Sequence, residues 1–239
     1  MAGIGAEFGH SELPKLRAGI TGAIEVHTAG GVLATGTITN ALIQVANDTI
    51  TLNGVWAKYT AAASDATKAG TLVDPLLINI KASLMLTLDE AVIVLNAAAH
   101  PALAVATYSK SGTTILVITY DTYVAAGNSY TLAASAGGVV SAATLTGGQD
   151  MGVISIATEP SEFKLTQSVN QRFSLANGED AQQKFLYLDT KGGAGNVIVA
   201  PTSLTGGTII TFSVAGNYAE LRWMGTGWLM KSNSTAVVS

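Results

Sequence analysis

Apolar and polar residues alternate through most of this chain, which is the pattern of half-buried β-strands. In residues 21–150 the alternation recurs in short runs that Gly, Asn and Ser separate, as expected for strands joined by tight turns. The predicted strands of this part are AIEVHT, VLATGTIT, ALIQVA, DTITL, VWAKYT, LLINIK, ALAVATYS, TTILVITYD, SYTLAAS and VVSAATLTGG. The first half of the chain is therefore predicted to be rich in β-structure.

One turn signal is specific enough to predict its geometry. Asn53-Gly54 lies between the alternating runs DTITL and VWAKYT. Asn followed by Gly is the pair that best tolerates the two positive φ angles of a two-residue type I′ turn. We therefore expect a tight β-hairpin centred on these two residues.

A single segment has the features of a helix, from about residue 88 to about residue 98. Thr87 and Glu90 have the Thr-x-x-Glu spacing of a capping box, AVIVLNAAA supplies an apolar face, and a His-Pro pair ends the segment. The β-branched run Val92-Ile93-Val94 favours a strand instead. The prediction for residues 21–150 is thus a β-sheet module with one packed α-helix.

The remainder, residues 151–239, contains only strand patterns. They are MGVISIAT, EFKLTQ, QRFSLANG, QKFLYLDT, GNVIVAP, GGTIITF, YAELRWM and GWLMKS, separated by Gly or Asn turns. So many short strands without a helical stretch are typical of a β-sandwich or barrel. Gly147-Gly148 marks the border, and we predict an all-β, sandwich-like or barrel-like C-terminal domain after it.

The start of the chain differs from both parts. Residues 1–20 contain four glycines and Pro14 but few bulky apolar side chains, as in an extended N-terminal arm. Such an arm can dock on a neighbouring subunit, and Phe8, Leu13 and Leu16 are its candidate interface residues.

The composition favours a subunit of an assembly. Charged residues make up 12% of the chain and hydrophobic residues 48%, so the charged share is about half that of an average globular protein. Weakly charged surfaces tend to associate, which suits a subunit covered by neighbours better than a free enzyme. The net charge is −4 and the twelve Lys and Arg residues are scattered singly, which argues against a nucleic-acid partner.

Neither a secretory signal nor a membrane span is predicted. The first ten residues lack the basic and apolar segments of a signal peptide. Two long uncharged stretches, residues 91–109 and 122–149, are interrupted by Pro or rich in Gly, Ser and Thr, so neither has the pattern of a transmembrane helix.

No sequence motif of catalysis or metal binding occurs. His10, His27 and His100 lack metal-ligand spacing, and the absence of Cys excludes thiolate chemistry. KGGAGN at residues 191–196 is followed by a strand rather than the helix of a phosphate-binding loop, so we predict a hairpin loop. Glu179-Asp180 is predicted to be a solvated turn, the alternative being a cation site or an acid and base pair. Carboxylates paired from distant positions, as in glycosidases, leave no motif. We expect a protein without enzymatic activity, cofactor or metal.

Two Trp residues near the C-terminus are the most conspicuous aromatic pair. In ELRWMGTGWLMK the Gly225-Thr226-Gly227 turn folds two strands together, so that Trp223 and Trp228 can pack across the hairpin in the core or cap it. A carbohydrate-stacking platform and an anchor for a neighbouring subunit are the alternatives. With Arg222, these residues are the candidate surface or interface residues of what we predict to be the last strand pair.

Two stretches resemble modules of bacteriophage structural proteins. Residues 47–148, which include NDTITLNGVWAKYTAAAS, TLDEAVIVLNAAA, VATYSKSGTTILVITYDTYVAAGNSYTLAAS and VVSAATLTGG, resemble a module that recurs in tailed bacteriophages. Residues 173–231, from FSLANGEDAQQKFLYLDT to YAELRWMGTGWLMK, are similar to small β-domains of capsid decoration and head-fibre proteins and of some tail proteins. Neither pattern includes catalytic residues.

The resemblance implies a structural virion protein that binds and stabilises the phage capsid as a decoration, or cement, protein. Its implied partners are the major capsid protein and copies of itself, for example in a homotrimer, with no nucleic acid and no membrane. The implied location is the capsid exterior, after synthesis in the cytoplasm of a bacterial host. A tail tube, tail fibre or baseplate component is the alternative, and a carbohydrate-binding adhesin module is a further one.

Overall fold

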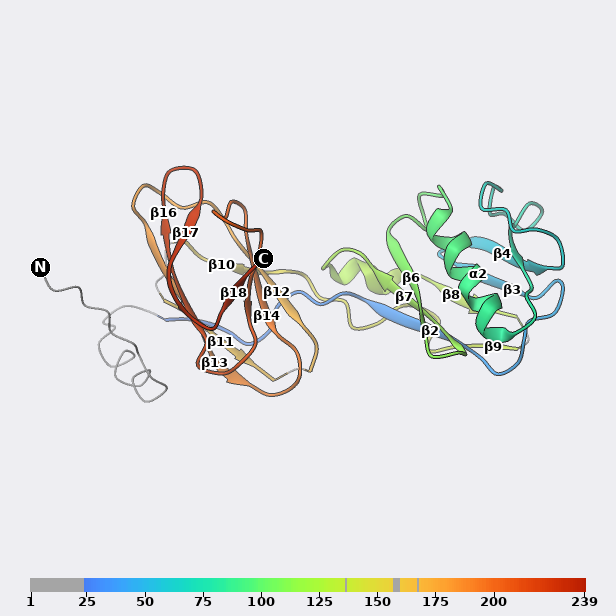
Figure 1. The fold of residues 1–239 in the computed structure, drawn as a ribbon, viewed down its shortest axis with the longest axis horizontal. Helices are drawn as coiled ribbons and strands as arrows, with labels where there is room; N and C mark the ends of the chain where they lie inside the picture. Colours follow the sequence, from blue (N-terminus) through green and yellow to red (C-terminus); the bar gives the residue numbers. More distant parts are fainter. Residues whose placement is uncertain (1–23, 136, 157–159, 167) are drawn as a thin grey trace, which may run out of the picture. The chain divides into compact units, whose positions relative to one another are not determined.

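The computed structural model describes residues 24–135, 137–156, 160–166 and 168–239 (Figure 1). The protein is mainly β, with α2 as the one α-helix of these residues. It divides into two compact units. Val32–Asp150 form the first, which we call the insert unit, and the described residues up to Gly31 form the second together with those from Met151 to Ser239, which we call the sandwich unit. The predicted arm of residues 1–20, with Phe8, Leu13 and Leu16, lies outside the described residues.

The division of the chain differs from the predicted one at its start. The units separate after Asp150, as expected, but the first module begins at Val32 and not at residue 21. Strand β1 (Glu25–His27) pairs in parallel with β11 (Ser161–Leu165), so it belongs with the C-terminal residues. The alternating pattern of β1 indicates a strand but contains no information on its partner. The insert unit therefore interrupts the chain of the sandwich unit between β1 and β10 (Gly152–Ile154).

The sandwich unit consists of two five-stranded sheets. Sheet A has the order β1, β11, β13 (Gln183–Lys191), β16 (Tyr218–Trp223) and β17 (Trp228–Ser234). Sheet B has the order β10, β12 (Gln171–Leu175), β14 (Val197–Pro201), β15 (Ile210–Phe212) and β18 (Val237–Val238). The first three strands of each sheet are parallel, and the last two pair antiparallel.

The parallel pairing arises because the chain changes sheet after each strand from β10 to β13. Each strand then pairs with the strand two places before or after it, not with the next one. Residues 191–196 connect β13 in sheet A to β14 in sheet B, so the predicted hairpin loop is wrong and this segment is a crossover. Glu179 and Asp180 are exposed in the crossover between β12 and β13, in agreement with the predicted solvated turn.

The core of the sandwich unit lies between the two sheets. Every second residue of the strands points inward, as their alternation requires. Phe163 of sheet A lies 4.9 Å from Phe173 and 5.9 Å from Phe212 of sheet B, measured between ring centroids. Each such buried side chain contributes about 1.5–3 kcal/mol. The buried apolar residues are Ile154, Phe163, Leu165, Phe173, Leu175, Leu186, Leu188, Val197, Val199, Ile210, Phe212, Ala219, Leu221, Trp223, Trp228 and Ala236.

The insert unit has two four-stranded sheets, a 3₁₀-helix (Ala125–Ser129) and α2. The first sheet has the order β6 (Ala106–Ser111), β7 (Ile115–Tyr120), β2 (Thr35–Asn40) and β9 (Gly138–Val140). The second has the order β5 (Leu76–Asn79), β4 (Val55–Thr60), β3 (Thr49–Leu52) and β8 (Leu132–Ala134). All pairs are antiparallel except β4 with β5.

The hairpin predicted at Asn53-Gly54 is confirmed. It joins β3 to β4, and the φ angles of its two central residues are 48° and 81°. Both angles are positive, as a type I′ turn requires.

The helix begins one turn before the predicted position. α2 spans Leu84–Ala97, and the side chain of Ser83 caps it by accepting the Leu86 N–H. Thr87 is not the cap, because its hydroxyl donates to the Ser83 carbonyl oxygen at 2.9 Å. Glu90 accepts a hydrogen bond from Ser64 instead of closing a capping box, so the predicted box is wrong. Ser83 and Thr87 are both N-cap residue types, and the sequence alone does not rank them.

The predicted strand ALIQVA is also wrong. Residues 41–46 form a loop between β2 and β3, which we call the apolar loop. Gln44 is its buried residue, and its Nε2 donates to Asn40 Oδ1 at 2.6 Å. The apolar side chains on both sides of Gln44 are exposed. The observed burial is the reverse of what we expect from side-chain polarity. Gln44 is buried because its hydrogen-bond acceptor, Asn40 Oδ1, lies inside the unit.

Candidate functional site

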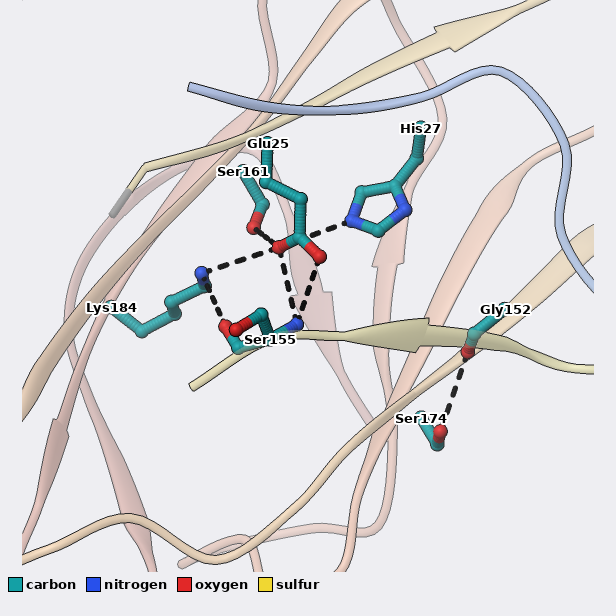
Figure 2. Close-up of polar contacts among 7 residues, drawn as sticks. All are labelled: Glu25, His27, Gly152, Ser155, Ser161, Ser174 and Lys184. Carbon is teal, nitrogen blue, oxygen red and sulfur yellow. Dashed lines mark hydrogen bonds and ion pairs between the residues drawn. The ribbon is translucent and has the colours of Figure 1, made fainter. Parts of the chain in front are cut away.

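Polar and titratable side chains gather where β1 joins sheet A (Figure 2). Glu25 and His27 come from β1, Lys184 from β13, Ser161 from the start of β11, and Ser155 directly follows β10. We call these five residues the β1 cluster. It unites side chains from both ends of the sandwich unit's chain, since Glu25 and Ser155 are separated by 130 residues.

Glu25 is the centre of the β1 cluster. Its Oε2 accepts a hydrogen bond from Ser161 Oγ at 2.7 Å, and its Oε1 accepts the Ser155 N–H at 2.9 Å. One carboxylate thereby ties β1 to β11 and to the residue after β10. Its hydrogen bonds are charge-assisted, which makes them stronger than bonds between neutral groups.

Lys184 supplies the positive charge. Its side chain is fully buried at a core-facing position of β13, where Leu186 and Leu188 follow at the same face. The ammonium donates to the Ser155 carbonyl oxygen at 2.7 Å and lies 3.6 Å from Glu25 Oε2. Burial of a charge costs several kcal/mol unless partners compensate for the lost water. The carbonyl and the carboxylate provide that compensation here.

His27 fills the apolar side of the cluster. Its ring stacks on Phe163 at 5.4 Å and meets the edge of Phe173 at 5.2 Å, and its Nε2 lies 3.3 Å from Glu25 Oε2. Burial lowers the pKa of His27 below its ordinary value, and this outweighs the opposing attraction of Glu25. The imidazole is therefore neutral at pH 7.

Glu25 remains ionised despite its partial burial. Burial alone would raise the pKa of this carboxyl, but the bonds from Ser161 and Ser155 and the nearby His27 and Lys184 lower it below its usual value. The β1 cluster at neutral pH is thus a carboxylate and an ammonium with a neutral imidazole beside them.

The order of these groups does not suit nucleophilic catalysis. In a hydrolase triad the imidazole lies between the hydroxyl and the carboxylate and takes the proton of the hydroxyl. Here the Ser161 hydroxyl donates directly to Glu25, and His27 contacts the same carboxylate from another side. Ser161 is also fully buried. What the arrangement does is hold β1 in sheet A.

Within the described ranges, no three or more His, Cys, Asp or Glu side chains come together in a way that would hold a metal ion. His27 and His100 belong to different units, and His100 accepts the Ala102 N–H in the turn after α2. His10 lies outside the described residues.

The two Trp residues predicted at the surface are buried. Trp223 and Trp228 are only 6% and 0% exposed and meet edge to face, with ring centroids 5.6 Å apart. Trp228 Nε1 donates to the Ala176 carbonyl oxygen at 2.8 Å. The core interpretation is confirmed and the surface interpretation is wrong, because both positions are in the inward phase of their strands. This hairpin is not the last strand pair either, since β18 follows it and joins sheet B.

Arg222 alone of the predicted C-terminal residues lies away from the core. It alternates with buried Leu221 and Trp223 on β16 and is half-buried. Its neighbours across the strands are Gln183 on β13 and Leu229 on β17. It takes no part in the β1 cluster, and among the predicted site residues that the structure describes, the ring contact it brings about is that of the two Trp residues.

The β1 cluster itself escaped the sequence analysis. In AIEVHT the apolar phase suggests that Val26 faces the core, whereas Val26 is exposed and Glu25 and His27 point inward. The one available signal was Lys184, which shares the phase of Leu186 and Leu188 in QKFLYL. A Lys in an apolar phase indicates a buried charge and hence a partner, but not where the partner comes from.

No helix among the described residues has the length and apolar character needed to cross a membrane. The chain matches no protein-family model, and no curated protein or solved structure is significantly similar to it.

Proposed function

We propose that this protein is a structural subunit of a tailed-bacteriophage virion that binds the outside of the capsid as a decoration protein, without enzymatic activity. The observation that carries the proposal is the surface, which combines few charges with many exposed aliphatic side chains. Surfaces of this kind are suited to contact with neighbours. The exposed aliphatic residues include Val26, Leu42, Val45, Leu72, Val73, Ile93, Val139, Val153, Val214 and Val237.

Two further observations support the proposal. Residues 47–148 and 173–231 resemble modules of phage structural proteins. The titratable groups of the β1 cluster are engaged with one another in holding the fold, and the Ser161 hydroxyl is buried.

The physical action of such a subunit is stabilisation by mass action. A protein that binds the assembled shell and not its separated parts favours the shell by RT ln(1 + [L]/Kd), about 2.7 kcal/mol per site at a hundredfold excess over Kd. The partners are then the major capsid protein and further copies of this chain, for example as a trimer at a threefold position of the capsid.

The test is the position of this protein in particles of the phage that encodes it. We expect gold-labelled antibodies against the chain to mark the capsid surface in electron micrographs. We also expect purified protein to bind stripped heads saturably, and a variant lacking residues 1–20 to lose that binding. Label on neither heads nor tails would overturn the proposal, and unchanged binding of the truncated variant would overturn the role of the arm.

A tail tube, tail fibre or baseplate component is the second candidate, because the C-terminal stretch is similar to domains of some tail proteins as well. Label confined to the tail would favour it. A glycan-binding role built on Trp223 and Trp228 is not proposed, because both rings are buried and offer no face to a sugar.

A further inference from the structure

The apolar loop presents hydrophobic side chains to solvent in an unusual density. Leu42, Ile43 and Val45 are 73%, 39% and 63% exposed, and the alanines at both ends of the loop are exposed as well. The single polar side chain among residues 41–46, Gln44, is only 4% exposed. A loop normally shows the opposite arrangement, since burying apolar groups is favourable and polar groups are satisfied by water.

Hydrogen bonds fix the loop in this orientation. Gln44 Nε2 donates to the buried Asn40 Oδ1, and the Val45 N–H donates to Asp48 Oδ2 at 2.9 Å. The Asn47 N–H donates to the Tyr59 carbonyl oxygen of β4 at 3.0 Å. Turning the aliphatic side chains inward would break these bonds, so the loop is preorganised with its apolar side outward.

The neighbouring strand carries a further exposed aliphatic residue near the loop. Gly138 of β9 pairs with Asn40 at the end of β2, so β9 lies beside the start of the apolar loop (Figure 1). Val139 is the next residue of β9 and is 70% exposed. We call Leu42, Ile43, Val45 and Val139 the apolar patch.

The charges around the patch restrict its partner. Residues 39–47 contain no charged side chain, and Asp48 already accepts bonds from the Val45 N–H and the Ser135 hydroxyl. Binding to an anionic membrane surface would call for Lys or Arg beside the apolar residues. A second copy of the chain fits, because a patch without charge meets itself without repulsion between like charges.

The size of the patch restricts the strength of the contact. Stable protein complexes bury about 800 Å² on each partner, which involves some 20–30 residues. Four aliphatic residues and two flanking alanines supply only part of such an area. The contact is therefore weak and reversible in free solution, and it gains strength where many copies are held side by side.

We propose that the apolar patch packs against the same patch of another copy of this chain. This contact deepens the proposed function and rests on it, because that function already names further copies of this chain as partners and the contact assigns the surface through which two copies meet.

The first experiment is sedimentation velocity of the full chain over a concentration series up to about millimolar. We expect wild type to associate as the concentration rises, and the variant Leu42→Asp/Val45→Asp to associate at least tenfold more weakly. The matched control is Leu72→Asp/Val73→Asp, which places the same charges on two aliphatic residues that are 68% and 93% exposed in another loop of the insert unit. It should associate as wild type does. Circular dichroism would verify that both variants are folded, with Leu42→Ser/Val45→Ser as a milder replacement.

The second experiment uses the absence of Cys from the chain. Under mild oxidation Val45→Cys should give a disulfide-linked dimer, whereas Val73→Cys, although more exposed, should stay mostly monomeric. Three results would each overturn the proposal. They are a wild type that remains monomeric throughout the series, an equal loss of association in both Asp variants, and equal crosslinking of both Cys variants. Binding of monomeric wild type to phosphatidylcholine vesicles would do so too and would assign the patch to lipid.

Discussion

The two units build their β-sheets from the chain in different ways. The insert unit is continuous in sequence and is built largely from antiparallel neighbours. The sandwich unit is assembled from two separated parts of the chain, and its β1 docks in parallel against β11 through a partly buried carboxylate. The charged cluster thus lies where β1 joins the C-terminal part of the sandwich unit, which, among the described strands, is the pairing between segments farthest apart in the sequence.

The buried polar groups of the two units follow the same division. In the insert unit the hydroxyls of Tyr108 and Tyr130 lie 2.6 Å apart in the core, and both groups are neutral. In the sandwich unit Glu25 and Lys184 are charged, so the loss of a partner costs more there. The hydrogen bonds of these charged groups also fix the register of β1 in the sheet. A three-residue strand with only apolar side chains would leave that register poorly specified.

The largest effect is expected from Glu25→Ala. It removes the carboxylate 3.6 Å from the buried ammonium of Lys184 and leaves the Ser155 and Ser161 donors to find other partners. We expect a loss of about 3 kcal/mol in the free energy of unfolding of the sandwich unit, with the insert unit unchanged. Hydrogen exchange measured by mass spectrometry during urea unfolding reports the two units separately. The double variant Glu25→Ala/Lys184→Met should lose less than Glu25→Ala alone, and an equal or larger loss would contradict a charge pair.

Acid should also destabilise the sandwich unit through the β1 cluster, by a smaller amount than the Glu25→Ala substitution. The folded pKa of His27 is lowered, so its contribution is fully present above about pH 6.5 and is lost progressively as the pH falls from there towards the folded pKa. The folded pKa of Glu25 is lowered as well, so its contribution is present above about pH 4.5 and is lost as the pH falls through the folded value. The protonated carboxyl keeps some hydrogen bonds, which limits the loss.

Alkali should act on the other unit. Burial raises the pKa of Tyr130 to about 12, so its contribution to the insert unit is complete below pH 10 and is lost as the pH rises from there through 12. Urea midpoints of each unit, followed by hydrogen exchange between pH 4 and pH 11, check both directions. A sandwich unit that is as stable at pH 4 as at pH 8 would refute the role of the β1 cluster.

Tyr108→Phe should destabilise the insert unit alone. It removes one hydroxyl of the buried pair and leaves that of Tyr130 without its 2.6 Å partner, at a cost of about 1–2 kcal/mol. Tyr108→Phe/Tyr130→Phe removes both hydroxyls, so the second change should add little, which unfolding of both variants by urea would show. Full additivity would mean that the two hydroxyls do not act as a pair.

Gly54→Ala isolates backbone strain in the one turn that the sequence predicted in detail. Nothing lies within 4 Å of the added Cβ, so the cost comes only from the positive φ of 81°. We expect about 1 kcal/mol, confined to the insert unit. Thermal unfolding of the variant checks this, and an unchanged midpoint would show that the turn adapts.

How much the sequence predicts depends on how local each feature is. The Asn53-Gly54 hairpin and most of the strands were predictable, because turn residues and alternation act over a few positions. The pairing of β1 with β11 was not, since alternation does not indicate which strand a segment joins. The β1 cluster could not be predicted for the same reason. Glu25 points inward because Ser161 and Lys184, on other strands of the sheet, bind its carboxylate, and the sequence does not show that these strands are neighbours.

The smallest effect is expected when the insert unit is excised. Val32 and Gln149 exchange two backbone hydrogen bonds, of 3.2 Å and 2.9 Å, where the chain enters and leaves this unit, so its two ends are already held together. Its hydrophobic core consists of its own residues, from Ala34 to Leu145. Residues 32–150 expressed alone should therefore unfold in urea with a free energy within about 0.5 kcal/mol of the value in the full chain, as expected for independent domains. A loss well above 1 kcal/mol would show that the sandwich unit supports the insert unit, and the contrast between a self-contained and a divided unit would then fail.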